Sequence, residues 1–126
     1  MDELKPPGEI QMIGILHLVG GIMNILVGLM WGATGLFTGL LTFGIGLVYC
    51  CPAFINLPIG IMEVISAVKH LSKDHSGLSA PKVTSIVEIF SIMGCSMISV
   101  VCGIVSLVLM SKPEVQAYYD SKQLTG

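Results

Sequence analysis

The stretch from Ile10 to Trp31 constrains the fold more than any other part of this chain. It contains no Asp, Glu, Lys or Arg, and its length matches the roughly 20 residues that one helix needs to cross a bilayer core. Small or polar residues recur along it at alternating spacings of three and four, which places them on a single helix face. The sequence therefore predicts a membrane helix that packs against other helices through this face.

The composition of the whole chain supports a membrane class. Of its 126 residues, 53% are hydrophobic and 11% are charged, and the mean hydropathy is +0.87, whereas soluble domains carry about 25% charged residues. The net charge of -2 and the absence of a basic patch give no support for nucleic-acid binding. We expect a multi-pass integral membrane protein with one membrane domain, residues 1–126, in a plasma or inner membrane rather than an organelle.

The apolar blocks divide into candidate spans by length. The block from Leu36 to His70 would form a helix of about 52 Å, but the hydrocarbon core is only about 30 Å thick, so we expect two crossings with a break near Cys50–Pro52. The predicted architecture is all-α, a left-handed bundle of four transmembrane helices near 9–32, 35–50, 54–71 and 83–110. A short interfacial helix near 112–122 follows. The distribution of lysines favours an alternative with three spans, in which residues 36–50 form a re-entrant or tilted extension.

Glycine recurs at the spacing expected for close helix packing. In a bilayer, small residues mark the faces where helices approach each other, because lipid gives apolar faces no reason to associate. An average repeat of 3.5 residues predicts left-handed packing. The predicted helix-packing residues are Gly14, Gly21, Gly28, Gly35, Gly39, Gly46 and Gly60.

Two carboxylates interrupt the apolar segments. If the helices that carry Glu63 and Glu88 form an antiparallel hairpin around residues 72–82, the two side chains lie at comparable depth. A charge at that depth costs at least about 2.5 kcal/mol unless it is paired or hydrated. One hypothesis is a proton or cation site; the other, which we favour, is that neutral Glu side chains hold helices together by hydrogen bonds.

His17 and Asn24 lie seven residues apart on the predicted first helix. A membrane histidine can ligate haem, but a second axial histidine is then expected on a facing helix. His70 and His75 lie at or beyond a helix end, too shallow to match His17, so we favour a structural hydrogen bond. No zinc spacing, phosphate loop or nucleophile with its base occurs, and we expect no metal, no cofactor and no enzymatic activity.

Cys50 and Cys51 lie at a predicted membrane boundary. Cysteines in such a position are candidates for palmitoylation when the turn faces the cytoplasm. The alternative is that they act as small hydrophobic residues.

Two segments resemble the membrane-spanning four-domain family A, the B-lymphocyte antigen family. Residues 9–17, with Glu9-Ile10-Gln11-Met12 followed by Gly14-Ile15-Leu16-His17, are similar to its opening helix. Residues 57–66, with Leu57-Pro58-Ile59-Gly60-Ile61-Met62 and then Ile65-Ser66, are similar to its second helix. The resemblance implies a tetraspan that oligomerises and accompanies receptors or ion flux. Residues 33–50 have no place in that pattern, and the large outer loop of the family is absent.

Two functions follow from the sequence. The first is a packing role, as a homo-oligomer or an accessory subunit of a membrane complex, with the lipid bilayer, other copies of the chain or other membrane subunits as partners. The second is a small channel or a proton or cation transporter that uses Glu63 and Glu88.

Overall fold

The computed structural model describes residues 5–91 and 96–124, and this part of the chain is helical with no β-strand. The elements in chain order are α1 (Gly8–Leu41), the 3-10 helix η1 (Ile45–Cys50), α2 (Cys51–Leu71), α3 (Lys82–Phe90), α4 (Met97–Met110) and α5 (Pro113–Gln123). Two of the described helices, Gly8–Leu41 and Ile45–Leu71, are long and apolar enough to cross a membrane. The described part has up to three such spans if α4 and α5, which are bent by 82° at their junction, count as one.

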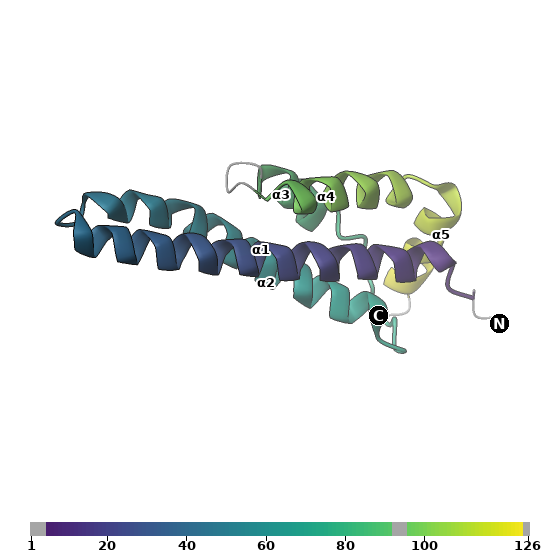
Figure 1. Ribbon diagram of the computed structural model, residues 1–126. Helices are drawn as coiled ribbons and strands as arrows, with labels where there is room; N and C mark the ends of the chain where they lie inside the picture. The colour runs from purple at the N-terminus through teal and green to yellow at the C-terminus, as the bar shows by residue number, and fades with distance from the viewer. Residues whose placement is uncertain (1–4, 92–95, 125–126) are drawn as a thin grey trace.

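The longest unit is a hairpin of α1 against η1 and α2 (Figure 1). The prediction of separate helices at 9–32 and 35–50 is wrong, because α1 runs unbroken for 34 residues to Leu41. The chain reverses at Phe43 and Gly44, which have φ values of 51° and 95°. The reversal is closed by a hydrogen bond of 2.7 Å from the Gly46 amide to Thr42 Oγ1.

The glycines near residue 32 do not end α1, although glycine weakens a helix in water. In lipid an unsatisfied backbone group costs several kcal/mol, so the helical hydrogen bonds are kept. Thr34, Thr38 and Thr42 each also donate their hydroxyl to the carbonyl oxygen four residues earlier, at 2.7–2.8 Å. The chain therefore stays helical past residue 32 and reverses at Phe43 and Gly44, where the Gly46 amide is paired with Thr42.

The break predicted near Cys50–Pro52 is a change of helix type within one candidate span. η1 passes directly into α2 at Cys51, and Pro52 occupies the first turn of α2, where its missing N–H is not needed. Residues 35–50 and 54–71 are therefore not two crossings. The first of these ranges is shared between the end of α1, the turn and η1.

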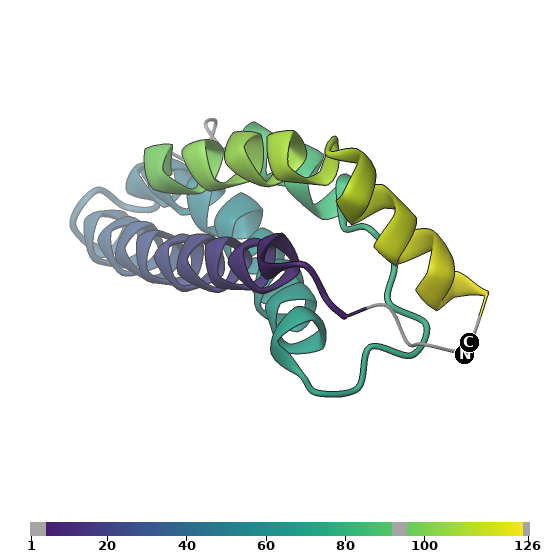
Figure 2. The ribbon, with the colours of Figure 1, turned by 90° about the vertical axis from the view of Figure 1, so that its right-hand side faces the viewer.

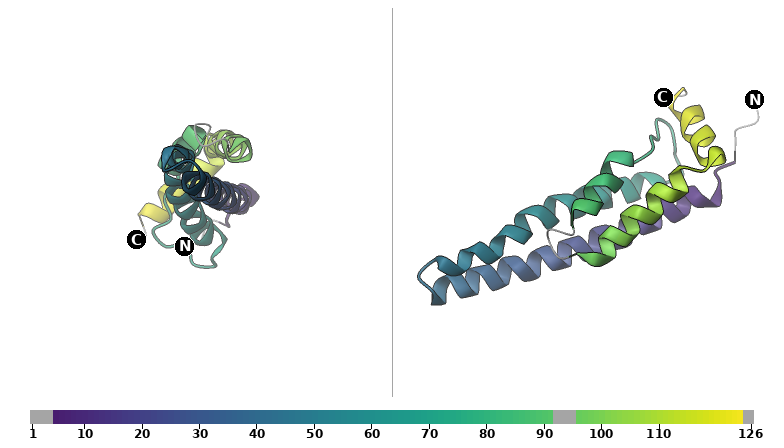
Figure 3. Two further views of the ribbon diagram at one scale, coloured as in Figure 1. Left: turned by 60° about the vertical axis from the view of Figure 1, so that its left-hand side comes forward. Right: turned by 90° about the horizontal axis from the view of Figure 1, so that it is seen from above.

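The prediction of one helix over 83–110 is also wrong. The structure has two antiparallel helices, α3 and α4, which lie side by side and cover only the half of the hairpin nearer the start of α1 (Figure 3). Gly103 permits this contact, because a Cβ atom there would lie 2.8 Å from Glu88 Cβ and 2.9 Å from the Ser85 carbonyl oxygen. The fold-back brings polar residues of both helices to the same side of α1.

The small helix α5 matches the predicted helix over 112–122 to within one residue at each end. It lies across the end of the bundle where α1 begins and α2 ends (Figure 2). Lys112, just before α5, forms an ion pair of 2.7 Å with Glu9 at the start of α1. A cluster of buried apolar side chains lies at this end, formed by Ile10, Ile13, Leu78, Met110, Val115, Tyr118 and Tyr119.

Candidate functional site

A cluster of buried polar side chains occupies the region where α1, α2, α3 and α4 meet. Its α1 members are His17, Gly20 and Asn24, which the helical repeat places on one face. The side chains of His17, Asn24, Glu63, Glu88 and Ser99 are each 0% exposed. We call this group, together with Ser85, the polar cluster; every side chain in it comes from a helix.

One half of the polar cluster joins α1, α2 and α4 through Asn24. The Asn24 amide donates to Glu63 Oε1 at 2.8 Å and to Ser99 Oγ at 2.7 Å. Ser99 in turn donates to the same Glu63 oxygen at 2.8 Å. One carboxylate oxygen therefore accepts two hydrogen bonds from two different helices.

The other half joins α1 and α3 through His17. Its Nδ1 lies 3.1 Å from Glu88 Oε1, and its Nε2 lies 3.4 Å from Ser85 Oγ. Ser85 and Glu88 are three residues apart on α3 and so share the face toward α1. The histidine is therefore held at both ring nitrogens by one short helix.

The two halves meet at Gly20, so that Glu63 and Glu88 face each other. A Cβ atom at Gly20 would lie 2.9 Å from Glu88 Oε1, 3.4 Å from Glu63 Oε2 and 3.5 Å from Ser99 Oγ. The absent side chain of Gly20 thus provides the space that both carboxyl groups occupy. Sequence reasoning selected its neighbour Gly21 and missed Gly20, although Gly20 lies midway between His17 and Asn24 along the helix.

Several atoms of the polar cluster have no hydrogen-bond partner within the described residues. They are Glu63 Oε2, Glu88 Oε2 and Asn24 Oδ1. Buried polar atoms are nearly always paired in native proteins, so an unpaired group calls for an explanation by an unseen water, ion or proton. Two carboxylates this close also repel each other when both are ionised. The arrangement is chemically suited to hold a shared proton or a small cation.

Two histidine–tyrosine pairs lie between the polar cluster and the end of the bundle where the chain starts. His70 Nε2 lies 2.9 Å from the Tyr119 hydroxyl, and His75 Nδ1 lies 2.6 Å from the Tyr118 hydroxyl. The rings of His17 and His70 are only 6.4 Å apart between centroids. The prediction that His70 is too shallow to match His17 is therefore wrong, because Gly14 lets the end of α2 approach α1, with a Cβ there only 2.9 Å from His70 Cβ.

The sequence offered little to reveal these pairs. Tyr118 and Tyr119 lie in the segment predicted as a short interfacial helix, and the return of that helix onto His70 depends on the 82° bend between α4 and α5. Both tyrosines are only 2% exposed. The adjacent aromatic residues were the one available signal, since buried tyrosine hydroxyls usually find a hydrogen-bond partner.

The predicted packing glycines lie along the contact between α1 and the returning η1–α2 segment. Gly21 and Gly60 face each other, and a Cβ atom on either would lie within 2.9 Å of the other's carbonyl oxygen. A Cβ on any of the others would press on a residue of the opposite arm of the hairpin: Gly14 on His70, Gly28 on Leu57, Gly35 on Cys50, Gly39 on Leu47 and Gly46 on Thr38. The stripe is used within the chain.

Cys50 and Cys51 differ in their surroundings. Cys50 is partly buried against Gly35, and its Sγ lies 3.7 Å from the Gly32 carbonyl oxygen, whereas Cys51 is exposed. Lipidation of either residue stays a prediction. Within residues 5–91 and 96–124, no three His, Cys, Asp or Glu side chains are grouped as metal ligands.

Comparison of the chain with protein-family models, curated proteins and solved structures found no match. The resemblance to the B-lymphocyte antigen family therefore stays an expectation from two short segments. The class that the fold defines is a small all-helical protein with candidate membrane-spanning helices and a buried polar cluster.

Proposed function

We propose that this protein binds and releases protons at the Glu63–Glu88 pair within the membrane, as a proton-conducting or proton-coupled membrane protein. One observation carries the proposal: two fully buried carboxyl groups face each other at Gly20, close enough to share a hydrogen bond when one of them is protonated. Ionisable residues inside a membrane segment are costly and are functional candidates by default.

The pattern of hydrogen bonds favours proton exchange over a purely structural role. A buried network that only holds helices together is stable when all its members are satisfied, and a half-satisfied network is less stable than an apolar core. Here Asn24 and Ser99 satisfy one oxygen of Glu63, and His17 satisfies one oxygen of Glu88. The two remaining Oε2 atoms are suited to share a proton, which would also remove the repulsion between two charges.

His17 adds a third site for the proton. Its Nδ1 lies at hydrogen-bond distance from Glu88 Oε1, so a proton moves between imidazole and carboxylate without a change of backbone. The three titratable groups come from α1, α2 and α3, and movement of the α3–α4 pair against the hairpin would change their separation. Such coupling between protonation and helix position is what a proton-driven transporter requires.

The test is proton flux into liposomes that contain the purified protein and a trapped pH-sensitive dye, driven by a potassium diffusion potential. We expect flux in the unchanged protein, at least a tenfold reduction in Glu63→Gln and Glu88→Gln, and none above background in the double variant. Glu114→Gln, in α5 and exposed, is the matched control and retains the flux. Absence of flux in the folded, unchanged protein contradicts the proposal.

A second candidate function is favoured by a different observation. The part of the hairpin beyond α3 and α4 exposes large apolar side chains with no other element of the described chain against them, among them Leu36, Phe37, Leu40 and Ile45 at 61–84% exposure. This surface supports a packing role, as a homo-oligomer or as an accessory subunit in contact with lipid and other membrane proteins. Native mass spectrometry from mild detergent measures it directly. If the protein is detected as a monomer without other subunits and its flux depends on Glu63 and Glu88, the packing role is contradicted and the proton-binding function stands.

A further inference from the structure

His70 lies between the polar cluster and the polar end of the bundle. It lies in the last turn of α2 and is only 3% exposed. Its ring centroid is 6.4 Å from that of His17. On its other side it meets Tyr119 of α5 and the loop that follows α2. No other described histidine lies as close to the polar cluster from this side.

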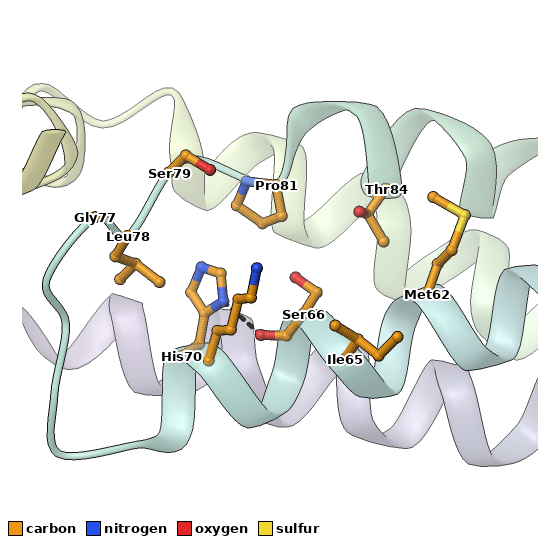
Figure 4. Close-up of a pocket in the computed structure, with 10 residues that line it drawn as sticks. Met62, Ile65, Ser66, His70, Gly77, Leu78, Ser79, Pro81 and Thr84 are labelled. Atoms are coloured by element: carbon orange, nitrogen blue, oxygen red, sulfur yellow. Dashed lines mark hydrogen bonds between the residues drawn. The ribbon is translucent and has the colours of Figure 1, made fainter. Parts of the chain in front are cut away.

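An open cavity reaches His70 from this end of the molecule. It has a volume of about 260 Å³ and lies between the last turns of α2 and residues 77–84. Figure 4 shows the His70 ring at its wall, with Ser66 beside it on α2 and with Ser79 and Thr84 on the opposite side. A second cavity of about 170 Å³, lined by residues at the start of α1 and by Ser72 and His75, also borders His70. Both cavities border His70 and neither is lined by a residue of the polar cluster, so His70 is the group through which water in them would meet the cluster.

The hydrogen bonds of His70 define how it receives a proton. Its Nδ1 lies 2.7 Å from the Ser66 carbonyl oxygen and so carries the hydrogen that it donates there. Its Nε2 is then the acceptor, at 2.9 Å from the Tyr119 hydroxyl, which donates to it. When Tyr119 turns its hydrogen away, Nε2 is the position at which a proton from cavity water is bound.

We infer that His70 is the relay residue through which protons pass between the cavity at this end of the bundle and the His17–Glu88–Glu63 group. This inference rests on the proposed function, because it names the access route to that same site. Water in the cavity protonates His70, the imidazolium returns to neutrality by giving one proton through a bridging water to His17, and His17 gives its Nδ1 proton to Glu88. One proton enters and one carboxylate is neutralised.

The groups around His70 suit a transient imidazolium. The titratable and charged side chains that face it are His17 from α1, Lys69 on its own helix, His75 from the following loop, and Tyr119 from α5. None of these is a carboxylate, and Lys69 opposes a second positive charge nearby. The proton is therefore passed on and not stored at His70.

The experiment compares His70→Ala with Tyr118→Phe in the same liposome assay, with imidazole added in a parallel series. We expect His70→Ala to lower the flux at least tenfold and added imidazole to restore part of it, since the deleted ring leaves a space beside an open cavity. Tyr118→Phe breaks the other histidine–tyrosine pair at a residue that lines neither cavity, and it retains flux within about twofold. His70→Gln keeps a hydrogen-bonding side chain of similar size but cannot relay a proton. We expect it to lower the flux as much as His70→Ala does, and this result does not depend on whether imidazole can enter the space left by the deleted ring.

The possible outcomes distinguish a failure of the His70 relay from a failure of the proposed proton binding at Glu63 and Glu88. Flux that depends on Glu63 and Glu88 but is unchanged in His70→Ala and His70→Gln overturns the relay and leaves the proposed function standing. An equal loss in Tyr118→Phe, together with no response of His70→Ala to imidazole, also overturns the relay, because a general loosening of this end of the bundle then explains the effect. Absence of any Glu-dependent flux in the unchanged protein removes the proposed function itself.

Discussion

The two halves of the α1–α2 hairpin use small residues for different purposes. In the distal half, Gly28, Gly35, Gly39 and Gly46 make room for a side chain or the backbone of the opposite arm, and no Asp, Glu, Lys, Arg or His side chain takes part in these contacts. In the half near the start of α1, Gly20 and Gly103 make room for two carboxyl groups. The same sequence pattern thus builds a dry contact in one half and a polar cluster in the other. A stripe of glycines indicates where helices approach each other. The side chains that face the glycines decide whether the contact is apolar or contains polar groups.

The largest expected effect comes from the close contact between Gly21 of α1 and Gly60 of α2. Gly21→Leu places a side chain where the Gly60 carbonyl oxygen already lies 2.9 Å from a Cβ position. Overpacking against backbone cannot be relieved by a rotamer change, so we expect a loss of about 3 kcal/mol or more. The measurement is unfolding in detergent followed by circular dichroism. Ile22→Leu, at a neighbouring position that is 47% exposed, is the control; equal stability of the two variants would refute the close crossing.

A smaller effect is expected from the polar half. Asn24→Ala removes two donated hydrogen bonds and leaves Glu63 and Ser99 with fewer partners. Loss of a partner to buried polar groups costs about 1–3 kcal/mol. Gln11→Ala, on an exposed position of the same helix, should change the free energy of unfolding by less than about 0.5 kcal/mol. If the free energies of unfolding of the two variants, measured in the same detergent, are equal, the Asn24 hydrogen bonds do not hold α1, α2 and α4 together.

The dry half can be tested with a single methyl group. Gly46→Ala places a Cβ against the Thr38 backbone and the Gly39 amide, whereas Gly32→Ala meets only Ala53 Cβ, at an ordinary 3.6 Å. Alanine favours helix by about 0.5–1 kcal/mol over glycine, so we expect Gly32→Ala to be neutral or stabilising. Gly46→Ala should lose about 1 kcal/mol. The comparison is made by thermal unfolding in one detergent, and a reversed order of the two melting temperatures contradicts this packing.

The smallest effect lies outside both halves, in the loop after α2. The Ser76 amide donates to Asp74 Oδ1 at 2.9 Å, and this bond holds the pKa of Asp74 below its usual value. A lowered pKa means that the stabilisation is present above the ordinary pKa of about 3.9 and is lost as the pH falls through the lower, folded value. The Ser76 amide resonance, followed by NMR against pH, should shift with that lowered pKa. In Asp74→Asn the same resonance should not titrate, and a shift that persists in this variant contradicts the assignment.

The sequence predicted the elements better than their boundaries. The apolar blocks, the loop around residues 72–82 and the helix near 112–122 follow from composition and spacing, and all are present. The end of the first helix predicted at residue 32 was wrong, because α1 continues to Leu41. The break predicted near Cys50–Pro52 is present as a change of helix type within one candidate span, and not as a boundary between two crossings. Here the cost of an unsatisfied amide in lipid keeps α1 helical until Thr42 can satisfy the turn.

The candidate site was predictable only in part. Glu63, Glu88, His17 and Asn24 stand out because polar residues are rare in such segments. Their mutual contacts depend on α3 folding back along α4, and nothing in the run from Val83 to Met110 announces that reversal. The partnership of His70 with Tyr119 depends in turn on where α5 lies. Pairings set by long-range contacts are not contained in the local spacing of residues.

The position of the cations has a consequence for how the molecule sits across its membrane. All six lysines, Lys5, Lys69, Lys73, Lys82, Lys112 and Lys122, belong to segments at the single end of the bundle where α1 begins and α5 lies, and no Asp, Glu, Lys or Arg occurs from Ile10 to Met62. Loops rich in lysine stay in the cytoplasm during insertion. By this rule we expect the end that carries the lysines, and with it the cavity beside His70, to face the cytoplasm. The cytoplasmic pH would then govern how the proposed relay is loaded.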